Sequence, residues 1–299
     1  MIPTTPAVVL VTGASSGIGR ACALYLARRG FTVFATSRRS AVAVSAELHA
    51  ELPAEARLDV LGMDVDADDS VREAIERLLE RAQRIDAVVH CAGFGIGGAV
   101  EDTEDDEARA IFETNLLGTL RVCRAVLPRM RRQGSGALVV VSSIGGRIAL
   151  PFQGLYSATK FAVEGLLEAM SMEVRSSGVR VALIEPGDFH TGFTDRRARV
   201  RRSQQGSAYH DAFERALTVI EVDERGGATP EPIARLVERI LLSNRPRLRY
   251  TIGPLPQRLA VRLKGILPGR AFEKILRVYY RLDASLREGA VGVRGGRDV

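Results

Sequence analysis

The feature that most constrains this chain is the glycine-rich turn TGASSGIG at residues 12–19, which joins an apolar run to a helical pattern. The run at residues 7–11 predicts a buried strand, and RACALYLARRG predicts a helix that ends at Gly30. In this context the glycines let backbone N–H groups and the helix N-terminus approach a pyrophosphate. The turn therefore predicts a dinucleotide site. The residues of the turn expected to bind the cofactor are Gly13, Ser15, Ser16, Gly17, Ile18 and Gly19.

Strand-like apolar runs and helical patterns alternate along the residues that follow. Further strands are expected at residues 32–38, 58–63, 86–89, 138–141, 180–184 and 247–252, with amphipathic helices between most of them. This alternation predicts an α/β fold, a single-domain Rossmann doubly wound parallel sheet of about seven strands with helices on both faces. We expect this domain to cover residues 1–253. Ligands of such sheets bind at the carboxyl ends of the strands, where every motif described below is located.

The second predicted strand ends at Ser37 and Arg38, where a dinucleotide fold meets the adenosine ribose. An acid at this point selects the ribose 2′-hydroxyl, whereas an arginine accommodates a 2′-phosphate. Residues 36–40 contain no Asp or Glu, so Arg38 favours NADP(H) over NAD(H), with Ser37 assisting. The alternative is that Arg38 and Arg39 are solvated surface residues. Asp64 and Val65 follow the third strand, and Asp64 is either an acceptor for the adenine amino group or a helix cap.

Three residues form a candidate catalytic group. Tyr156 and Lys160 lie four residues apart at the start of a helical pattern, which places both side chains on one helix face. A fixed positive charge lowers the pKa of a phenol, so Lys160 would let Tyr156 exchange protons with a substrate near neutral pH. Ser143, at the end of the preceding strand, could orient the same substrate oxygen. Taken alone, this spacing more often belongs to a half-buried tyrosine and a solvated lysine, so the interpretation depends on the rest of the chain.

Asn115 breaks the apolar stripe of the helix predicted after residue 103. A buried amide must find hydrogen-bond partners, so this residue either contributes to a site or ties two backbone segments together. The sequence leaves both interpretations open.

With these residues identified, the chain resembles a classical short-chain dehydrogenase/reductase. TGASSGIG matches the glycine motif of that family, and Asn115, Ser143, Tyr156 and Lys160 match its catalytic tetrad. The resemblance implies that Lys160 also binds the nicotinamide ribose and that Asn115 holds a water molecule in a proton relay.

Two further segments carry the resemblance. Pro186, Gly187 and Thr191 match the segment that holds the nicotinamide carboxamide. After the fourth strand the family usually has Asn-Asn-Ala-Gly, and here the sequence is His90, then Cys91-Ala92-Gly93. Cys91, Ala92 and Gly93 are expected to border the cofactor. The missing amide is expected to weaken a structural hydrogen bond rather than to impair the chemistry.

Within the family the chain is similar to the branch of 17β-hydroxysteroid and retinol dehydrogenases, through GRIALPFQGLYSATKFAVEGL, EPGDFHT and the segment RPRLRYTIGPLPQRLAVRLKGILP. This similarity implies NADP(H)-dependent hydride transfer with a secondary alcohol or ketone of a hydrophobic, steroid-, retinoid- or lipid-like molecule. One alternative is a 3-oxoacyl thioester reductase. Another is a non-catalytic NADP(H)-binding interaction protein, against which the complete tetrad argues.

Residues 188–228 are polar and basic with scattered aromatic residues, and we expect them to form a mobile lid over the crevice. Phe189 is a candidate substrate contact together with Ser143 and Tyr156. The arginine cluster of this segment is not interleaved with its aromatic residues, which argues against nucleic acid as a partner.

The chain carries a net charge of +6, and residues 245–299 hold 13 basic and 4 acidic residues, so the main body is mildly acidic. Residues 254–287 are predicted to form a basic amphipathic helical extension. It could pack against the body, join subunits of a homodimer or homotetramer, or contact anionic lipid peripherally. Residues 288–299 are predicted to be a disordered tail.

The cysteines and the apolar runs of the sequence indicate where in the cell the protein is expected. The three cysteines are scattered without metal-ligand spacing, so neither a disulfide framework nor a metal site is expected. The first apolar run is too short for a signal peptide, and no run reaches the roughly 18 residues that a membrane span needs. We therefore expect a cytoplasmic protein, with a membrane-peripheral location as the alternative.

Overall fold

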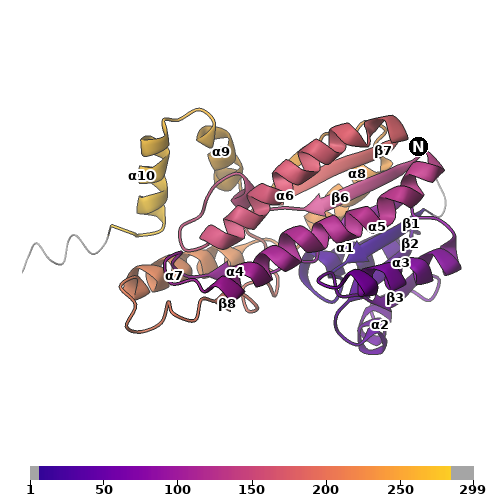
Figure 1. Cartoon of the computed structure of the whole chain (residues 1–299), viewed down its shortest axis with the longest axis horizontal. Helices are drawn as coiled ribbons and strands as arrows, with labels where there is room; N and C mark the ends of the chain where they lie inside the picture. Colours follow the sequence, from indigo (N-terminus) through magenta and orange to yellow (C-terminus); the bar gives the residue numbers. More distant parts are fainter. Residues whose placement is uncertain (1–6, 284–299) are drawn as a thin grey trace, which may run out of the picture.

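A seven-stranded sheet forms the centre of the computed structural model, which describes residues 7–283 (Figure 1). Its strand order is β3-β2-β1-β4-β6-β7-β9, and all neighbouring pairs run parallel. The strands are β1 (Val8–Thr12), β2 (Thr32–Ser37), β3 (Leu58–Gly62), β4 (Ala87–His90), β6 (Gly136–Val141), β7 (Val179–Pro186) and β9 (Arg249–Ile252). The predicted Rossmann architecture and its seven main strands are confirmed.

Helices cover both faces of this sheet. On one face lie α1 (Gly17–Arg28), α2 (Ala41–His49) and α8 (Glu231–Leu242), and on the other α3 (Asp68–Ala82), α5 (Gly118–Gln133) and α6 (Gly154–Glu173). Strand β1 shows why its first four residues are apolar. Val9 and Val11 pack into the core beneath α1, whereas Val8 and Leu10 pack into the core beneath α3 and α5. A strand buried on both faces favours apolar side chains, and the buried Thr12 at its end has hydrogen-bond partners for its hydroxyl.

The helix predicted after residue 103 is interrupted. It begins as α4 (Asp105–Phe112), widens into the π-helix η1 (Glu113–Leu117) and continues as α5. Glu107 accepts a hydrogen bond from the backbone N–H of Glu104, the N-cap residue, so the helix is capped at Glu104. Single π turns are frequent at functional sites. Here the π turn carries Asn115.

The segment predicted as a lid contains structure that its polar sequence did not indicate. Residues 210–226 form the 17-residue helix α7 (His210–Gly226). The short strand β8 (Ala198–Arg199) pairs in parallel with β5 (Ile96–Gly97), which follows β4. The lid segment is therefore joined by backbone hydrogen bonds to the loop at the carboxyl end of the sheet.

The predicted C-terminal extension forms two helices, α9 (Leu255–Lys264) and α10 (Gly269–Tyr279). Figure 1 shows them in yellow as a pair set apart from the layers around the sheet. Within residues 7–283, no helix is both long and apolar enough to cross a membrane. The end of the extension and the predicted disordered tail at 288–299 lie outside the described residues.

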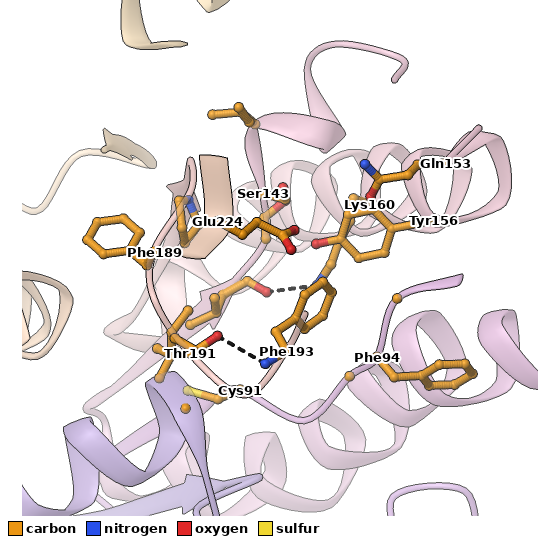
Figure 2. Close-up of a pocket in the computed structure, with 18 of the residues that line it drawn as sticks. Cys91, Phe94, Ser143, Gln153, Tyr156, Lys160, Phe189, Thr191, Phe193 and Glu224 are labelled. Atoms are coloured by element: carbon orange, nitrogen blue, oxygen red, sulfur yellow. Dashed lines mark hydrogen bonds between the residues drawn. The ribbon is translucent and has the colours of Figure 1, made fainter. Parts of the chain in front are cut away.

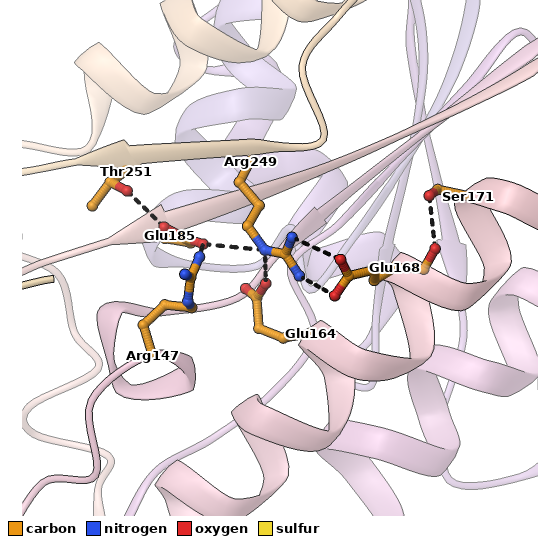
Figure 3. Close-up of polar contacts among 7 residues, drawn as sticks. All are labelled: Arg147, Glu164, Glu168, Ser171, Glu185, Arg249 and Thr251. Atoms are coloured by element: carbon orange, nitrogen blue, oxygen red, sulfur yellow. Dashed lines mark hydrogen bonds and ion pairs between the residues drawn. The ribbon is translucent and has the colours of Figure 1, made fainter. Parts of the chain in front are cut away.

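An arginine on the last strand ties the sheet to the helix that carries the candidate catalytic pair (Figure 3). Arg249 Nε donates to Glu164 Oε2 at 2.8 Å, and its Nη2 donates to Glu168 Oε2 at 2.9 Å. Arg249 Nε also lies 3.7 Å from the buried Glu185 on β7, whose second oxygen accepts from Thr251 at 2.6 Å. The guanidinium thus compensates buried carboxylates on two elements at once.

Replacing Arg249 by Met should lower the free energy of unfolding by about 3 kcal/mol, because the buried Glu164 loses its cationic partner. Arg235→Met is the matched control, since Arg235 forms an exposed pair with Glu231 on α8. Its cost should be about 0.5 kcal/mol or less. Urea unfolding of the two variants measures the difference, and equal losses would contradict a structural role for the Arg249 network.

Candidate active site

A cavity of about 1140 Å³ opens at the carboxyl edge of the sheet (Figure 2). Most of the predicted site residues line it: Gly13, Ser15, Ser16, Gly17, Ile18, Gly19, Ser37, Arg38, Val65, Cys91, Ala92, Gly93, Ser143, Tyr156, Lys160, Pro186, Gly187, Phe189 and Thr191. Asp64 and Asn115 are not among the lining residues. Strand ends, the lid segment and both C-terminal helices therefore enclose one space.

The glycine turn leaves no room for side chains at its closest approaches. A Cβ atom on Gly19 would lie 2.4 Å from the carbonyl oxygen of Gly13. Gly13 itself has a φ of +65°, and a Cβ there would lie 3.0 Å from the backbone of Ala92. The turn is therefore a bare backbone cradle before the N-terminus of α1, which fits a pyrophosphate group.

At the adenosine end of the cavity, Asp64, the predicted adenine acceptor, is not among the lining residues, and its role stays a prediction. Its Oδ1 accepts a hydrogen bond from the backbone N–H of Asp66 at 3.1 Å. Asp66 lines the cavity instead, and its Oδ1 is buried without a hydrogen-bond partner in the described residues. Its other oxygen accepts from Thr114 at 2.9 Å. A buried free acceptor fits an adenine amino group, and the sequence signal was an acid two residues beyond the expected one.

Arg38 lies at the same end of the cavity, with 61% of its side chain exposed and 3.7 Å from Asp66. Its neighbour Arg39 instead pairs with Glu47. Ser37 accepts a hydrogen bond from the backbone of Arg39 at 2.9 Å. Arg38 therefore remains available to a ligand in this structure, whereas Arg39 is already paired.

Ser143, Tyr156 and Lys160 lie together in the cavity, as Figure 2 shows. Ser143 follows β6, and its Oγ accepts from the backbone N–H of Gly145 at 3.0 Å. Lys160 Nζ lies 5.7 Å from the centroid of the Tyr156 ring and donates to the carbonyl oxygen of Val141 at 3.1 Å. Both Tyr156 and Lys160 are buried.

Burial shifts the pKa of each member of this pair against its charged form. It raises the pKa of Tyr156 to about 12, with hydrogen bonding from Ser143 acting in the opposite direction and the charge of Glu224 adding to the rise. It lowers the pKa of Lys160 to about 8. The predicted lowering of the Tyr156 pKa is therefore wrong for this structure, because desolvation outweighs the hydrogen bond from Ser143 and the charge of Arg197.

The side-chain amide of Asn115 has hydrogen-bond partners within the protein. Its Nδ2 donates to the carbonyl oxygen of Phe94 at 3.0 Å and to Thr159 Oγ1 at 3.1 Å. Its Oδ1 accepts from the N–H of Phe94 at 3.0 Å. The side chain thus ties the loop after β4 to α6, which carries the catalytic pair, and its relay role stays a prediction.

His90 replaces the expected amide with a ring nitrogen. Thr12 Oγ1 accepts from the N–H groups of Cys91 and Ala92, at 3.1 and 3.2 Å, and lies 3.0 Å from His90 Nδ1. With both lone pairs in use, the Thr12 hydroxyl donates to Nδ1, which leaves the ring proton on Nε2. Burial lowers the pKa of His90 to about 3, so the ring is neutral.

Sequence reasoning missed the acidic and aromatic residues of the predicted lid segment and the C-terminal extension that also line the cavity. They are Asp188, Asp223, Glu224, Tyr279 and Tyr280. Their only sequence signal was an acid pair within the apolar pattern of residues 210–226. Only folding brings these residues beside Tyr156.

The fold and this site together define a dinucleotide-dependent oxidoreductase. The family model described as short chain dehydrogenase matches residues 7–201. The chain belongs to this family, whose members act on CH–OH or ketone groups, and the Ser143, Tyr156 and Lys160 cluster is located where the family resemblance predicts it.

Two relatives refine the comparison. The chain is 38% identical over 277 residues to a 3-ketodihydrosphingosine reductase of Bacteroides thetaiotaomicron, covering 93% of this chain and 99% of that one. It is 35% identical over 254 residues to human 17-beta-hydroxysteroid dehydrogenase type 1, covering 81% and 76%. The predicted relationship to the hydroxysteroid dehydrogenase branch is confirmed.

A solved structure is also similar. It is an alcohol dehydrogenase from the archaeon Thermococcus sibiricus in complex with 5-hydroxy-NADP, with a TM-score of 0.68 and 27% identity. The match covers 83% of this chain and 97% of that one.

Lys160→Met should stabilise the cofactor-free protein near neutral pH, because burying the wild-type ammonium is unfavourable. The folded-state pKa of Lys160 is lowered from 10.5 to about 8, so the unfolded state binds more protons between these values. The stability of the wild type relative to the variant should therefore rise by about 3 kcal/mol as pH rises across this window. Urea unfolding at several pH values tests this, and a flat difference would contradict it.

Proposed function

We propose that this protein transfers a hydride between NADP(H) and the ketone or secondary alcohol of a long-chain, lipid-like substrate. The observation that carries the proposal is one continuous cavity. It joins the glycine cradle, the Ser143, Tyr156 and Lys160 cluster, and an apolar chamber lined by α9 and α10.

A bound nicotinamide would supply or accept the hydride at the substrate carbon. In the reductive direction Tyr156 gives its proton to the carbonyl oxygen, and the raised pKa keeps this phenol protonated at physiological pH. Ser143 donates a hydrogen bond to the same oxygen and orients it. Lys160 holds the ribose of the cofactor, and Asn115 passes protons onward through a water molecule, as the family resemblance implies.

NADP(H) is the proposed cofactor because Arg38 lines the cavity, is largely exposed and has no carboxylate closer than Asp66 at 3.7 Å. Asp66, in place of Asp64, is proposed to accept from the adenine amino group. The NADP analogue bound in the similar archaeal enzyme supports NADP(H) as the cofactor. Apart from Asp64, the residues proposed to contact the cofactor are those predicted from the sequence.

The substrate is proposed to be lipid-like because the chamber beyond Tyr156 is apolar. The apolar side chains that α9 and α10 contribute include Ala260, Leu263, Phe272, Ile275 and Leu276. The Bacteroides relative is a 3-ketodihydrosphingosine reductase, which supports a lipid-like substrate over a steroid. A 3-oxoacyl thioester reductase and a non-catalytic NADP(H) sensor remain the alternatives.

Peripheral attachment to anionic membranes is proposed for the same two helices. Leu255 and Leu259 on α9, Ile266 in the turn after it and Val278 on α10 are each at least 43% exposed. Seven basic residues accompany them on residues 254–283, against two acidic residues. A basic amphipathic surface of this kind suits an anionic bilayer. The predicted cytoplasmic location and homo-oligomeric state stay predictions.

Tyr156→Phe should lower kcat for ketone reduction by at least about a hundredfold, because the proton donor is lost. The affinity for NADPH, measured by nicotinamide fluorescence, should stay within about threefold, since the ring and its packing are kept. Loss of turnover together with cofactor binding would contradict the assigned role, and so would full activity of the variant.

Arg38→Ala should raise KM for NADPH about tenfold or more and leave KM for NADH nearly unchanged, because only the 2′-phosphate loses a charged partner. Initial rates with each cofactor and one ketone measure this. An Arg39→Ala variant is the neighbouring control and should change neither value strongly. Equal effects of Arg38→Ala on both cofactors would remove the phosphate-binding role.

Replacing Leu255 and Ile266 together by Ser should weaken sedimentation with vesicles that contain phosphatidylserine, because two of the most exposed apolar contacts are lost. Val42→Ser, at an equally exposed position on α2, should have no effect. Neutral phosphatidylcholine vesicles should bind the wild type more weakly than anionic ones. Equal binding of all three proteins to both vesicle types would end the membrane proposal.

A further inference from the structure

An acidic wall lies beside the catalytic phenol. It consists of Asp188, which follows β7, and of Asp223 and Glu224 on α7, and all three residues line the cavity. Figure 2 shows the Glu224 carboxylate directed toward the Tyr156 hydroxyl. The charges of Glu224 and Asp188 both raise the pKa of Tyr156, so these carboxylates act on the phenol at close range. An otherwise apolar ketone pocket does not need such a wall.

The protein itself compensates only part of this negative charge. Glu224 pairs with the buried Arg197 and accepts from Thr194 at 2.7 Å. Asp188 accepts from the Gln257 amide and Asp223 from the Tyr279 hydroxyl, which are neutral donors.

Among residues 7–283, no ion pair reaches Asp188 or Asp223. Arg196 also lines the cavity, but it is exposed and forms no ion pair with the wall. Burial raises the pKa of Asp188 to about 6, which still leaves it ionised at neutral pH. The wall thus presents two carboxylates without a cationic partner.

Two polar side chains in the same cavity point independently to a polar ligand. Tyr280 is only 8% exposed and Gln153 only 5%, and both line the cavity. Neither the Tyr280 hydroxyl nor the Gln153 side-chain amide forms a hydrogen bond to another part of the described chain. Their polar atoms are not among the fully buried ones, so they are open to the cavity and available to a polar ligand there. The charge of Asp188 acts on Tyr280 as well, which places this phenol at the wall.

We propose that Asp188, Asp223 and Glu224 form a subsite that binds a protonated amino group of the substrate, adjacent to the ketone oriented by Ser143 and Tyr156. The inference rests on the proposed function and specifies its substrate as a long-chain amino ketone. An ammonium group has three donors and no acceptor, so it matches a wall of carboxylates and a phenol oxygen. A neutral ketone of the same length would leave the wall uncompensated in a poorly solvated pocket.

The apolar chamber and the acidic wall would each bind a different part of the substrate. Leu263, Phe272 and Leu276 of the C-terminal helices would take the alkyl chain. The amino group would face Asp188 and Asp223, which leaves the carbonyl between the two ends at Tyr156. The position of the wall would therefore determine which carbonyl group along the alkyl chain lies at Tyr156 for reduction.

The test compares three substrates of equal chain length with purified full-length protein and NADPH: a 2-amino-3-ketone, its N-acetyl derivative and the 3-ketone without nitrogen. The wild type should show at least a tenfold higher kcat/KM for the free amine than for the other two. Asp188→Asn and Asp223→Asn, which keep their hydrogen-bond acceptors, should each lower this value about tenfold for the amine and change it less than twofold for the others.

Glu221→Gln is the matched control, because Glu221 lies on the same helix but does not line the cavity. It should leave all three substrates unchanged, which separates local recognition from general charge. Equal kcat/KM for the amine and the nitrogen-free ketone in the wild type would overturn the subsite while leaving the proposed function intact. Equal losses for all substrates in the Asn variants would also overturn it.

A binding measurement tests the amine subsite independently of turnover. If the protein reduces no ketone, the proposed function is overturned, but the binding result still tests the subsite. Decylamine should bind the protein at least tenfold more tightly than decanol, as followed by calorimetry, and this preference should vanish in the Asp188→Asn variant. Equal affinities for the two compounds would overturn the acidic subsite.

Discussion

Parallel pairing of the seven strands is the constraint on which the site depends. Because all strands run in one direction, every carboxyl end falls at the same edge of the sheet, and loops distant in sequence meet there. The glycine turn after β1, Ser143 after β6 and the segment after β7 line one cavity for this reason. The Arg249 network fastens β9 to α6 (Figure 3), so the helix that carries Tyr156 is held against the same edge.

Burial sets the electrostatics of this edge. Desolvation keeps Tyr156 protonated, brings the pKa of Lys160 toward neutrality and holds His90 neutral. Each shift has the same cause, the cost of placing a charge where little water remains. The carboxylates of Asp188 and Asp223 have no ion-pair partner within residues 7–283. A poorly solvated pocket retains such charges best when a ligand neutralises them.

The C-terminal helices extend the cavity beyond what the sheet alone could form. α9 and α10 stand apart from the sheet layers (Figure 1), yet residues from both line the cavity. Their inner side chains complete an apolar chamber, while several of their outer apolar side chains stay exposed among basic residues. One pair of helices thus provides both the wall of the chamber and the surface proposed to meet a membrane.

The sequence by itself determined the strand and helix alternation, the dinucleotide turn and the Ser143, Tyr156 and Lys160 cluster, because these depend on local periodicity and on short motifs. It could not determine the π turn at Asn115, the helix α7 within a polar segment, or that Asp66 lines the cavity, since each depends on packing against distant residues. The direction of the Tyr156 pKa shift was predicted wrongly, because the spacing to Lys160 is visible in a sequence and burial is not. Only the tertiary structure brings the carboxylates of residues 188, 223 and 224 into the cavity of Tyr156, because the loop after β7 and helix α7 are distant in sequence.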